Sequence, residues 1–320
     1  MNDTASKTAD ASPGDVDLSI CIISYNTRDM TLACIASVLR ETCLSYEIIV
    51  VDNASTDGSA EAIAREYPDI HLIAEAENHG FARAHDIAVP ACKGKYLLLL
   101  NPDTVVLNGA IDTLMTFAET RPNAKIWGGR TLFADGTLNP YSCWRRQTLW
   151  SVLMAVTGLS SIFPNSPLFN PEAYGGWKRD TERAVDIVTG CFLLMPRALW
   201  DDLGGFDPLF FMYGEEADLC LRARRLCARP RITPDAEIVH YGGVSEKVRA
   251  DKMVRILKAK ISLIDRHFAP ATRWAGRMLL RLWPWSRMLA TRVLDGSAGS
   301  DRAKTWADIW ARRTEWWRGY

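Results

Sequence analysis

Short apolar runs alternate with amphipathic segments through the first quarter of the chain. Residues 18–24, 47–51 and 70–74 are rich in β-branched and other apolar side chains, which predicts three strands. Residues 30–42 carry apolar side chains at helical spacing, and a second helix is predicted to end near Tyr67. The order strand, helix, strand, helix, strand predicts a doubly wound α/β unit around a mainly parallel sheet.

The run Leu97–Leu100 predicts a further strand, buried on both faces. It ends at Asn101 and Pro102, because proline cannot continue a central strand. Asp103 is thereby left at the carboxyl end of a buried strand, where ligands bind in open α/β sheets. A carboxylate fixed there suits a divalent cation, and the cation suits a diphosphate. An ordinary turn that contains an aspartate is the alternative.

Two of the earlier strands also end in polar loops. Tyr25 and Asn26 follow the first strand, and Asp52 and Asn53 follow the second. Since the carboxyl ends of parallel strands share one edge, we expect both loops beside Asp103, where a nucleotide would lie. The first strand is not followed by G-x-G-x-x-G, and the chain has no G-x-x-x-x-G-K-[ST]. These absences argue against a dinucleotide dehydrogenase and a P-loop enzyme.

A second acidic cluster follows the aromatic run Phe210–Tyr213. It consists of Glu215, Glu216 and Asp218, at the start of a predicted helix. Carboxylates at a helix N-terminus are favoured by the helix dipole, so a structural role is one interpretation. The aromatic side chains would also desolvate a neighbouring carboxylate and raise its pKa toward that of a useful base, which favours a catalytic role.

Two single side chains are candidates for ligand contact. Arg83 follows Gly80 near a predicted helix start and either faces a phosphate or lies on the surface. His240 ends a predicted strand just before a Gly-Gly loop and is either a metal ligand or a structural residue. Residues 142–183 are rich in aromatic residues, glycine and proline. Such a long irregular segment is either a loop that covers the side of the site where a second substrate, the acceptor, would bind, or a partly helical excursion.

The chain from Lys247 to Leu294 differs from the rest in charge. It holds twelve Lys or Arg and two Asp, interleaved with Trp and Leu at helical spacing. Such a helix tends to lie in the interface of an anionic membrane, although a calmodulin-like or RNA partner could also recognise the charge. A cationic helix that packs its apolar side on the domain is a further alternative. The formal net charge of zero gives no general attraction to nucleic acid, and none is predicted as a partner.

Composition narrows the class of protein and the cellular compartment that the sequence predicts. The 320 residues are 48% hydrophobic and 24% charged, as in soluble globular proteins. None of the eight cysteines forms a C-x-x-C pair, so we predict buried thiols of a reducing compartment and no structural zinc. The polar N-terminus has no signal-peptide core and predicts a disordered lead-in over residues 1–16. The chain has no run of 18 apolar residues, so no membrane-spanning helix is predicted.

Seven short motifs occur along the chain in a fixed order. They are Ser24-Tyr25-Asn26, Val51–Ser59, Asn78-His79-Gly80-Phe81, Leu100–Asp103, Thr189-Gly190, Gly204–Asp207 and Gly214–Arg222. In this order the set resembles the family 2 inverting glycosyltransferases, and within them the bacterial rhamnosyltransferase-like enzymes of cell-surface polysaccharide synthesis. The resemblance covers residues 17–245. It implies a GT-A fold, a doubly wound mainly parallel sheet flanked by helices, with residues 246–320 as a basic, Trp-rich helical C-terminal region.

The resemblance also implies roles for individual residues. Asp103 takes the last position of the family's D-x-D motif and, with His240, would hold Mg²⁺ or Mn²⁺. Glu216 stands where the family has the aspartate base, one methylene longer, with Glu215 and Asp218 beside it as catalytic candidates. Asp86 is a second departure, since relatives more often have asparagine there. The residues that would bind the nucleotide sugar are Tyr25, Asn26, Asp52, Asn53, Asn78, Gly80, Arg83 and Asn101.

The activity implied by the resemblance is a single inverting displacement at an anomeric carbon. The donor would be a nucleotide diphosphate sugar, with rhamnose from a dTDP donor favoured, and the acceptor a glycan or a lipid-linked saccharide. The expected location is cytoplasmic, peripheral at the inner face of the cell membrane. A non-catalytic nucleotide-sugar-binding protein and a transferase that uses a UDP- or GDP-sugar are the alternatives. A pyrophosphorylase would normally need a Gly-rich basic loop after the first strand, which is missing.

Overall fold

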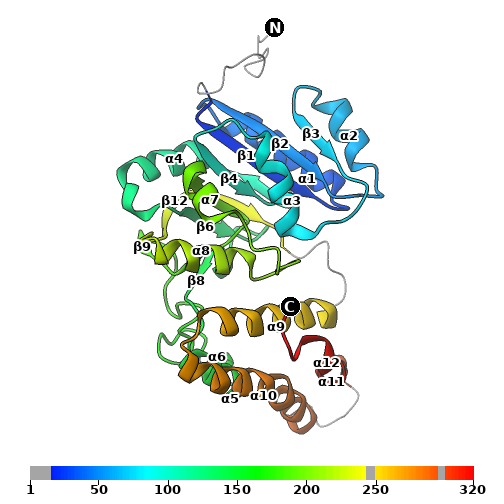
Figure 1. The fold of residues 1–320 in the computed structure, drawn as a ribbon, viewed down its shortest axis with the longest axis vertical. Helices are drawn as coiled ribbons and strands as arrows, with labels where there is room; N and C mark the ends of the chain where they lie inside the picture. The colour runs from blue at the N-terminus through cyan, green and yellow to red at the C-terminus, as the bar shows by residue number, and fades with distance from the viewer. Residues whose placement is uncertain (1–15, 243–248, 295–299) are drawn as a thin grey trace.

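The computed structural model describes residues 16–242, 249–294 and 300–320. The predicted lead-in up to residue 15 and the predicted boundary at residues 245–246 lie outside the described residues. Figure 1 shows a sheet with its covering helices in the upper part of the molecule and a group of helices below it.

The first half of the sheet is parallel, as the apolar pattern predicted. Its strands lie in the order β3-β2-β1-β4. These strands are β1 (Leu18–Ser24), β2 (Tyr46–Asp52), β3 (His71–Ala74) and β4 (Tyr96–Leu100). The connecting helices are α1 (Arg28–Glu41), α2 (Ser59–Glu66) and α3 (Gly80–Ala88), followed by the 3₁₀ turn η1 (Val89–Ala91). This is the predicted order of strands and helices.

Beyond β4 the sheet becomes mixed. Strand β11 (Phe192–Pro196) runs antiparallel between β4 and β6 (Trp127–Leu132). Strand β12 (Arg231–His240) is parallel to β6 and antiparallel to β5 (Thr104–Val106). The short strands β7 (Leu138–Asn139) and β9 (Arg183–Ala184) pair with β6 and β12 at the margin. Strand β10 (Ile187–Val188) pairs with β8 (Cys143–Trp144) in a separate small sheet. Thr189 and Gly190 follow β10 directly.

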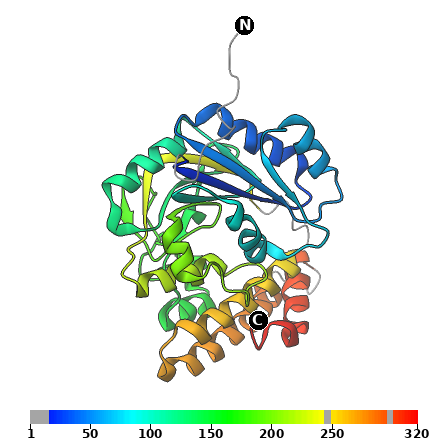
Figure 2. The same cartoon turned by 45° about the horizontal axis from the view of Figure 1, so that its top comes forward.

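The leucines of β4 confirm a strand buried on both faces. Leu97 and Leu99 belong to one core cluster, and Leu98 and Leu100 belong to the other. One face is covered by α1, α2 and α4, and the opposite face by α3, α7 and α8 (Figure 2). The elements not yet given are α4 (Ala110–Thr120), η2 (Pro122–Ala124), η3 (Pro140–Ser142), α7 (Arg197–Leu203) and α8 (Glu215–Arg225).

The loop that follows β1 is held by the loop that follows β2. The N-cap residue of α1, Thr27, makes no side-chain capping bond. Instead, the backbone N–H of Arg28 donates to Asp57 Oδ2 at 2.9 Å. The two carboxyl-edge loops are therefore joined to each other before any ligand binds.

The lower part of the molecule has its own core. It combines α5 (Leu149–Thr157) of the middle segment with α9 (Arg249–His267), α10 (Pro270–Leu294), α11 (Asp301–Ala311) and α12 (Arg313–Trp316). The short helix α6 (Leu159–Ile162) follows α5 and has no buried residue. Val152 of α5 packs in one cluster with Leu257, Leu280 and Trp316. The middle segment is therefore partly helical, and its helix α5 packs on the lower helices. No helix among the described residues has the length and apolar character needed to cross a membrane.

Candidate active site

One cavity of about 1920 Å³ contains the main chemical candidates of the sequence. Asp103, which follows β4, and His240, at the end of β12, line it together with Glu215 and Glu216 of α8. The residues that line the cavity come from the carboxyl edge of the sheet, from helices α8 and α9, and from the start of α5. Side chains that are more than one hundred positions apart in the sequence therefore share one space.

The pairing of β5 with β12 brings the two predicted metal ligands together. His240 lies opposite Thr104, and its Nε2 is 3.3 Å from Asp103 Oδ1. The amide Nδ2 of Asn101 is 3.3 Å from the same imidazole nitrogen, and Asn101 Oδ1 is buried without a hydrogen-bond partner among the described residues. Burial opposes protonation of His240, but the neighbouring Cys191 and Asp103 outweigh it and raise the pKa of His240 to about 11.

A carboxylate and an imidazole form an incomplete set of metal ligands. In the described ranges, no group of three or more His, Cys, Asp or Glu side chains could hold one ion. Mg²⁺ is commonly held by one or two carboxylates together with substrate phosphates, and imidazole is a usual ligand of transition metals. A metal-binding imidazole is neutral, so a cation would have to displace the proton of His240. Asp103 and His240 would then hold a cation whose other ligands come from a diphosphate and water.

The cavity wall on the side of β1 and β2 is polar and internally bonded. It includes Tyr25, Asn53, Asn78 and Gly80. Asn53 Nδ2 donates to Asn78 Oδ1 at 3.1 Å and to the carbonyl of Gly80 at 3.2 Å. Gly80 has φ +75°, and a Cβ added there would lie 2.3 Å from the carbonyl oxygen of Phe211. Only glycine fits this close approach.

Three residues predicted to bind the nucleotide sugar do not line the cavity. Asn26 is turned toward the second loop, where its Oδ1 accepts from the backbone N–H of Thr56 at 2.8 Å. Arg83 is exposed on α3 because the neighbouring positions of that helix face the core. Asp52 is buried directly behind the lining residue Asn53, and its Oδ1 has no partner among the described residues. Direct donor contact through Asn26 or Arg83 is therefore not supported.

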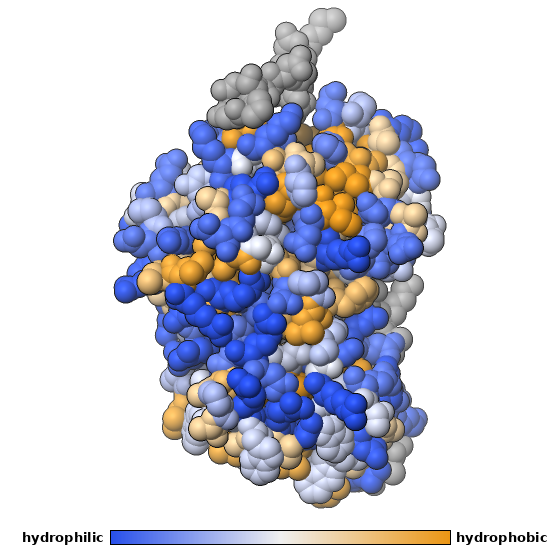
Figure 3. Space-filling model, viewed as in Figure 1, coloured by the Kyte–Doolittle hydropathy of each residue, from blue (hydrophilic) through white to orange (hydrophobic). Residues whose placement is uncertain are grey.

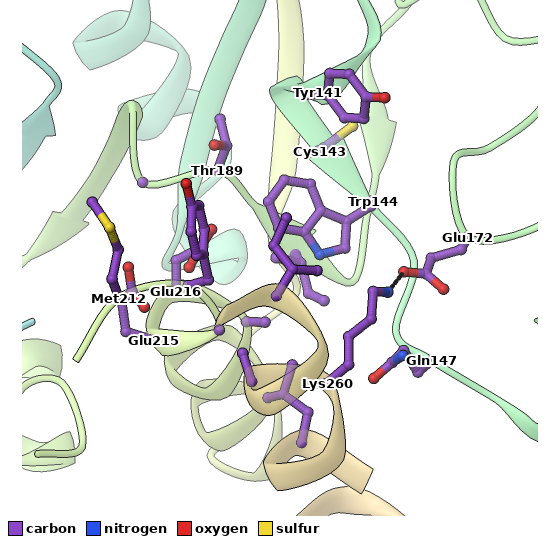
Figure 4. Close-up of a pocket in the computed structure, with 18 of the residues that line it drawn as sticks. Tyr141, Cys143, Trp144, Gln147, Glu172, Thr189, Met212, Glu215, Glu216 and Lys260 are labelled. Carbon is purple, nitrogen blue, oxygen red and sulfur yellow. Dashed lines mark hydrogen bonds and ion pairs between the residues drawn. The ribbon is translucent and has the colours of Figure 1, made fainter. Parts of the chain in front are cut away.

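The start of α8 carries two buried carboxylates into the cavity. Figure 4 shows Glu215 and Glu216 on the side of the cavity that also bears Thr189 and Met212, with Trp144 across from them. Each has an Oε2 that is buried without a hydrogen-bond partner in the described part of the chain. Burial raises the pKa of both groups, and the charge of Glu216 raises that of Glu215 further. A Cβ added at Gly190 would lie 3.8 Å from Cβ of Glu216, so the Thr189–Gly190 turn adjoins this carboxylate.

Asp218 does not line the cavity, although sequence placed it with the catalytic candidates. Its fully buried carboxylate accepts from Arg222 Nε at 2.6 Å, Arg266 Nε at 2.9 Å and His267 Nε2 at 2.8 Å. Burial would raise the pKa of Asp218, but hydrogen bonds from His267 and Arg222 outweigh it and lower the pKa to about 2. Asp218 therefore anchors α8 to α9, and a role as proton acceptor is not supported.

Asp86 is likewise outside the cavity. A Cβ at Gly205 would lie 2.5 Å from Asp86 Oδ1, so the carboxyl group packs against the turn after α7. Burial raises its pKa to about 6.

Sequence reasoning did not identify the wall that faces the carboxylates. It is formed by Trp144, Arg145 and Arg146, and by Lys252 and Lys260 of α9. An ion pair between Lys260 and Glu172 joins α9 to the middle segment across this wall (Figure 4). The only signal in the sequence was the interleaving of basic and aromatic residues in both segments, which does not reveal that they meet.

Comparison with known proteins decides the family. Residues 19–201, more than half of the chain, match the family model described as Glycosyl transferase family 2. The chain belongs to this family. Six of the eight cysteines of this family 2 glycosyltransferase are buried, as predicted for small core residues.

Relatives of this family 2 glycosyltransferase include two rhamnosyltransferases. The N-acetylglucosaminyl-diphospho-decaprenol L-rhamnosyltransferase of Mycobacterium tuberculosis is 27% identical over 83% of this chain and 91% of its own length. Rhamnosyltransferase WbbL of Escherichia coli is 24% identical over 78% of this chain and 86% of its own length. The predicted resemblance to rhamnosyltransferase-like members of family 2 is confirmed.

Solved structures confirm the fold. A mannosyltransferase from Pyrobaculum calidifontis, in complex with GDP-Man and Mn²⁺, matches 95% of this chain and 86% of its own chain with a TM-score of 0.56 and 17% identity. Staphylococcus aureus TarS, in complex with UDP, matches 89% of this chain and 76% of its own chain with a TM-score of 0.51 and 14% identity. The chain therefore has the predicted GT-A fold, with additional C-terminal helices.

Proposed function

We propose that this family 2 glycosyltransferase moves a sugar, with inversion, from a nucleotide diphosphate sugar to a hydroxyl of a saccharide or lipid-linked acceptor in cell-surface polysaccharide synthesis. The observation that carries the proposal is that Asp103 and His240 share one cavity with Glu216. A transferase of this kind needs a place for the donor diphosphate and a base for the acceptor at opposite ends of one short reaction path. A protein that only binds a nucleotide sugar would not need the second group.

Asp103 and His240 would hold a divalent cation at the donor diphosphate. When bound, Mg²⁺ or Mn²⁺ offsets the negative charge that develops on the leaving diphosphate. Asn101 lies against the same imidazole and would fix its orientation. Tyr25, Asn53 and Asn78 line the adjoining part of the cavity and would contact the nucleotide, with Gly80 allowing the close approach of the backbone.

Glu216 would accept the proton of the acceptor hydroxyl as the oxygen attacks the anomeric carbon. Its buried position raises its pKa, which makes the carboxylate a stronger base. Glu215 adjoins it and would hold a proton more readily than Glu216 does, because the charge of Glu216 raises the pKa of Glu215 further. Glu215 and Glu216 together would then carry a single negative charge. Attack from the face opposite the leaving diphosphate inverts the anomeric configuration.

The names of the relatives favour rhamnose as the transferred sugar, and we propose dTDP-rhamnose as its donor. Solved neighbours carry GDP-Man and UDP, so other nucleotides are the alternatives. A thermal-shift panel of nucleotide sugars with and without Mg²⁺ or Mn²⁺ tests the donor, since a ligand that binds the folded state raises the melting temperature. We expect the largest shift with dTDP-rhamnose and metal. Product formation from the same labelled donor must follow, and its absence with every acceptor would contradict transfer.

A lipid-linked acceptor would require access to a membrane surface, and α10 supports that access. The helix carries five arginines and no acidic residue. Trp274 and Val293 are 72% and 79% exposed, and Trp285 is 41% exposed. Figure 3 shows apolar and weakly polar side chains gathered at the lower end of the molecule, where α10 and α5 lie. A cationic helix with exposed Trp and Val suits the interface of an anionic bilayer, at the cytoplasmic face in this proposal.

A further inference from the structure

The segment from Trp144 to Ser151 forms a continuous strip of the cavity wall, and every one of its residues lines the cavity. At one end, β8 pairs with β10, beside the Thr189–Gly190 turn that adjoins Glu216. At the other end the chain enters α5, which belongs to the core of the lower helices. The order of residues along this strip is therefore also an order in space, from the proposed base to the helical part of the molecule.

The chemistry of the strip changes along its length. It begins with the indole of Trp144, continues with Arg145, Arg146 and Gln147, and ends in the apolar first turn of α5. Both arginines are exposed, and neither guanidinium has a carboxylate within ion-pair distance in the described ranges. The guanidinium of Arg145 lies over the ring of Tyr174 at 5.0 Å. Gln147 Oε1 is buried and has no hydrogen-bond partner there.

The far end of the cavity is lined mainly by apolar side chains from separate segments. Leu149 of α5 shares this wall with Phe169, with Phe268 after α9, and with Trp283 of α10. The apolar lining continues to the surface: Phe163, which is 46% exposed, contacts Phe169 at 5.1 Å between ring centroids. The polar reactants of sugar transfer do not account for an apolar arm that opens on exposed apolar surface.

We propose that this strip, with α9 and α10 opposite, is an acceptor track that binds a prenyl diphosphate. Trp144 would stack on the acceptor sugar beside Glu216, Arg145 and Arg146 would bind the two phosphates, and the apolar arm would hold the first part of the prenyl chain. Arg145 and Arg146 both line the cavity, and guanidinium groups match the oxygens of a diphosphate in charge and geometry. This inference rests on the lipid-linked acceptor of the proposed function and assigns that acceptor's binding residues.

Calorimetric titration with geranylgeranyl diphosphate, without donor or turnover, tests the track. The variant R145Q/R146Q should weaken binding at least about tenfold, since charge-assisted hydrogen bonds to the diphosphate are lost. The matched control R40Q/R65Q removes two exposed arginines from α1 and α2, outside the cavity, and should bind as the wild type does. Equal affinity of both double variants, or no binding to the wild type, would overturn the proposal.

Two further measurements separate the track from the donor site. D103N should leave the affinity for geranylgeranyl diphosphate unchanged, whereas loss of binding in D103N would place the diphosphate at the metal and contradict the track. L149N should weaken binding of geranylgeranyl diphosphate but not of inorganic pyrophosphate, and an equal effect on both would contradict the apolar arm. Thermal unfolding of each variant checks that it is folded. Failure of the proposed function would show differently, as absent sugar transfer from every donor despite prenyl diphosphate binding.

Discussion

Helix α8 places two kinds of acidic site within one turn. At its start, Glu215 and Glu216 face the cavity, and each keeps a buried oxygen without a partner among the described residues. Three positions after Glu215, the carboxylate of Asp218 faces away from the cavity and accepts from two arginines and a histidine. Burial is common to all three groups, so burial alone does not mark a catalytic carboxylate. The number of partners and the direction of the pKa shift distinguish the two kinds.

Replacement of the proposed base should give the largest effect. Glu216→Gln keeps the shape of the side chain but cannot accept the proton, so transfer should fall by about 10²–10⁴-fold. The affinity for the nucleotide sugar and the melting temperature should stay near those of the wild type, because no hydrogen bond to Glu216 Oε2 is lost. Turnover is measured with a labelled donor, and affinity by calorimetry. Wild-type turnover in this variant would remove Glu216 as the base.

Replacement of Asp218 should lower the stability of the fold, whereas replacement of Glu216 should lower turnover. In Asp218→Asn, the buried anion that Arg222, Arg266 and His267 share is lost, and the free energy of unfolding should fall by about 3 kcal/mol. Urea titration measures this loss. The matched variant Asp265→Asn removes an acid of α9 that is partly exposed and should cost less than about 1 kcal/mol. A loss in Asp218→Asn no greater than that of the control would contradict the anchor.

The anchor also predicts a pH dependence. The pKa of Asp218 in the folded state, about 2, lies below its usual value, so the folded state stabilises the charged form. This contribution to stability is complete above the unfolded pKa of about 4 and is lost as the pH falls toward 2. The difference in unfolding free energy between wild type and Asp218→Asn should therefore shrink below about pH 4. A constant difference over that range would contradict this assignment.

Asp103 lines the same cavity as Glu215 and Glu216, and its replacement tests the proposed metal site. Asp103→Ala should lower the metal-dependent affinity for the nucleotide sugar about tenfold or more, because one of the two protein ligands of the proposed cation is lost. Calorimetry with Mn²⁺ and again with a chelator separates the metal-dependent part of the affinity. If the variant binds the donor as the wild type does in both conditions, the metal role of Asp103 is refuted.

The smallest effect on the isolated enzyme is expected outside both sites. Trp274→Ser, Trp285→Ser and Val293→Ser together remove exposed apolar surface from α10 and should leave stability and transfer to a water-soluble acceptor nearly unchanged. Flotation with anionic liposomes should decrease, since interfacial binding depends on buried apolar area as well as on charge. Flotation equal to that of the wild type would contradict the membrane face. Neutral liposomes serve as the control for the electrostatic part.

The parts of the fold that were predictable depend on local signals. The β-branched runs and the four leucines of β4 each carry their own pattern, and they form the parallel half of the sheet as predicted. The antiparallel insertion of β11 between β4 and β6 depends on long-range pairing. No short pattern in the sequence encodes that pairing.

The candidate site also combines residues that the sequence indicated with residues that are brought together only by long-range packing. The leucine strand indicated the place of Asp103 at the carboxyl edge, and the family resemblance added His240 as its partner. The pairing of β5 with β12 brings the two side chains together. Sequence placed Asp218 with the catalytic candidates because no local pattern shows its partners Arg266 and His267, which lie almost fifty positions away. The wall formed by Arg145, Arg146 and α9 was missed for the same reason, since it exists only after the lower helices pack.

The link between α8 and α9 has a practical consequence for work with shortened chains. The boundary predicted near residue 245 invites a cut there to obtain a minimal catalytic fragment. Such a fragment would leave Asp218 without Arg266 and His267, and Gly214, where α8 starts, without the neighbouring Ala259. Deleting the last quarter of the polypeptide would then loosen the helix that carries the proposed base. Homologue swaps and expression trials should keep the two helices as a matched pair.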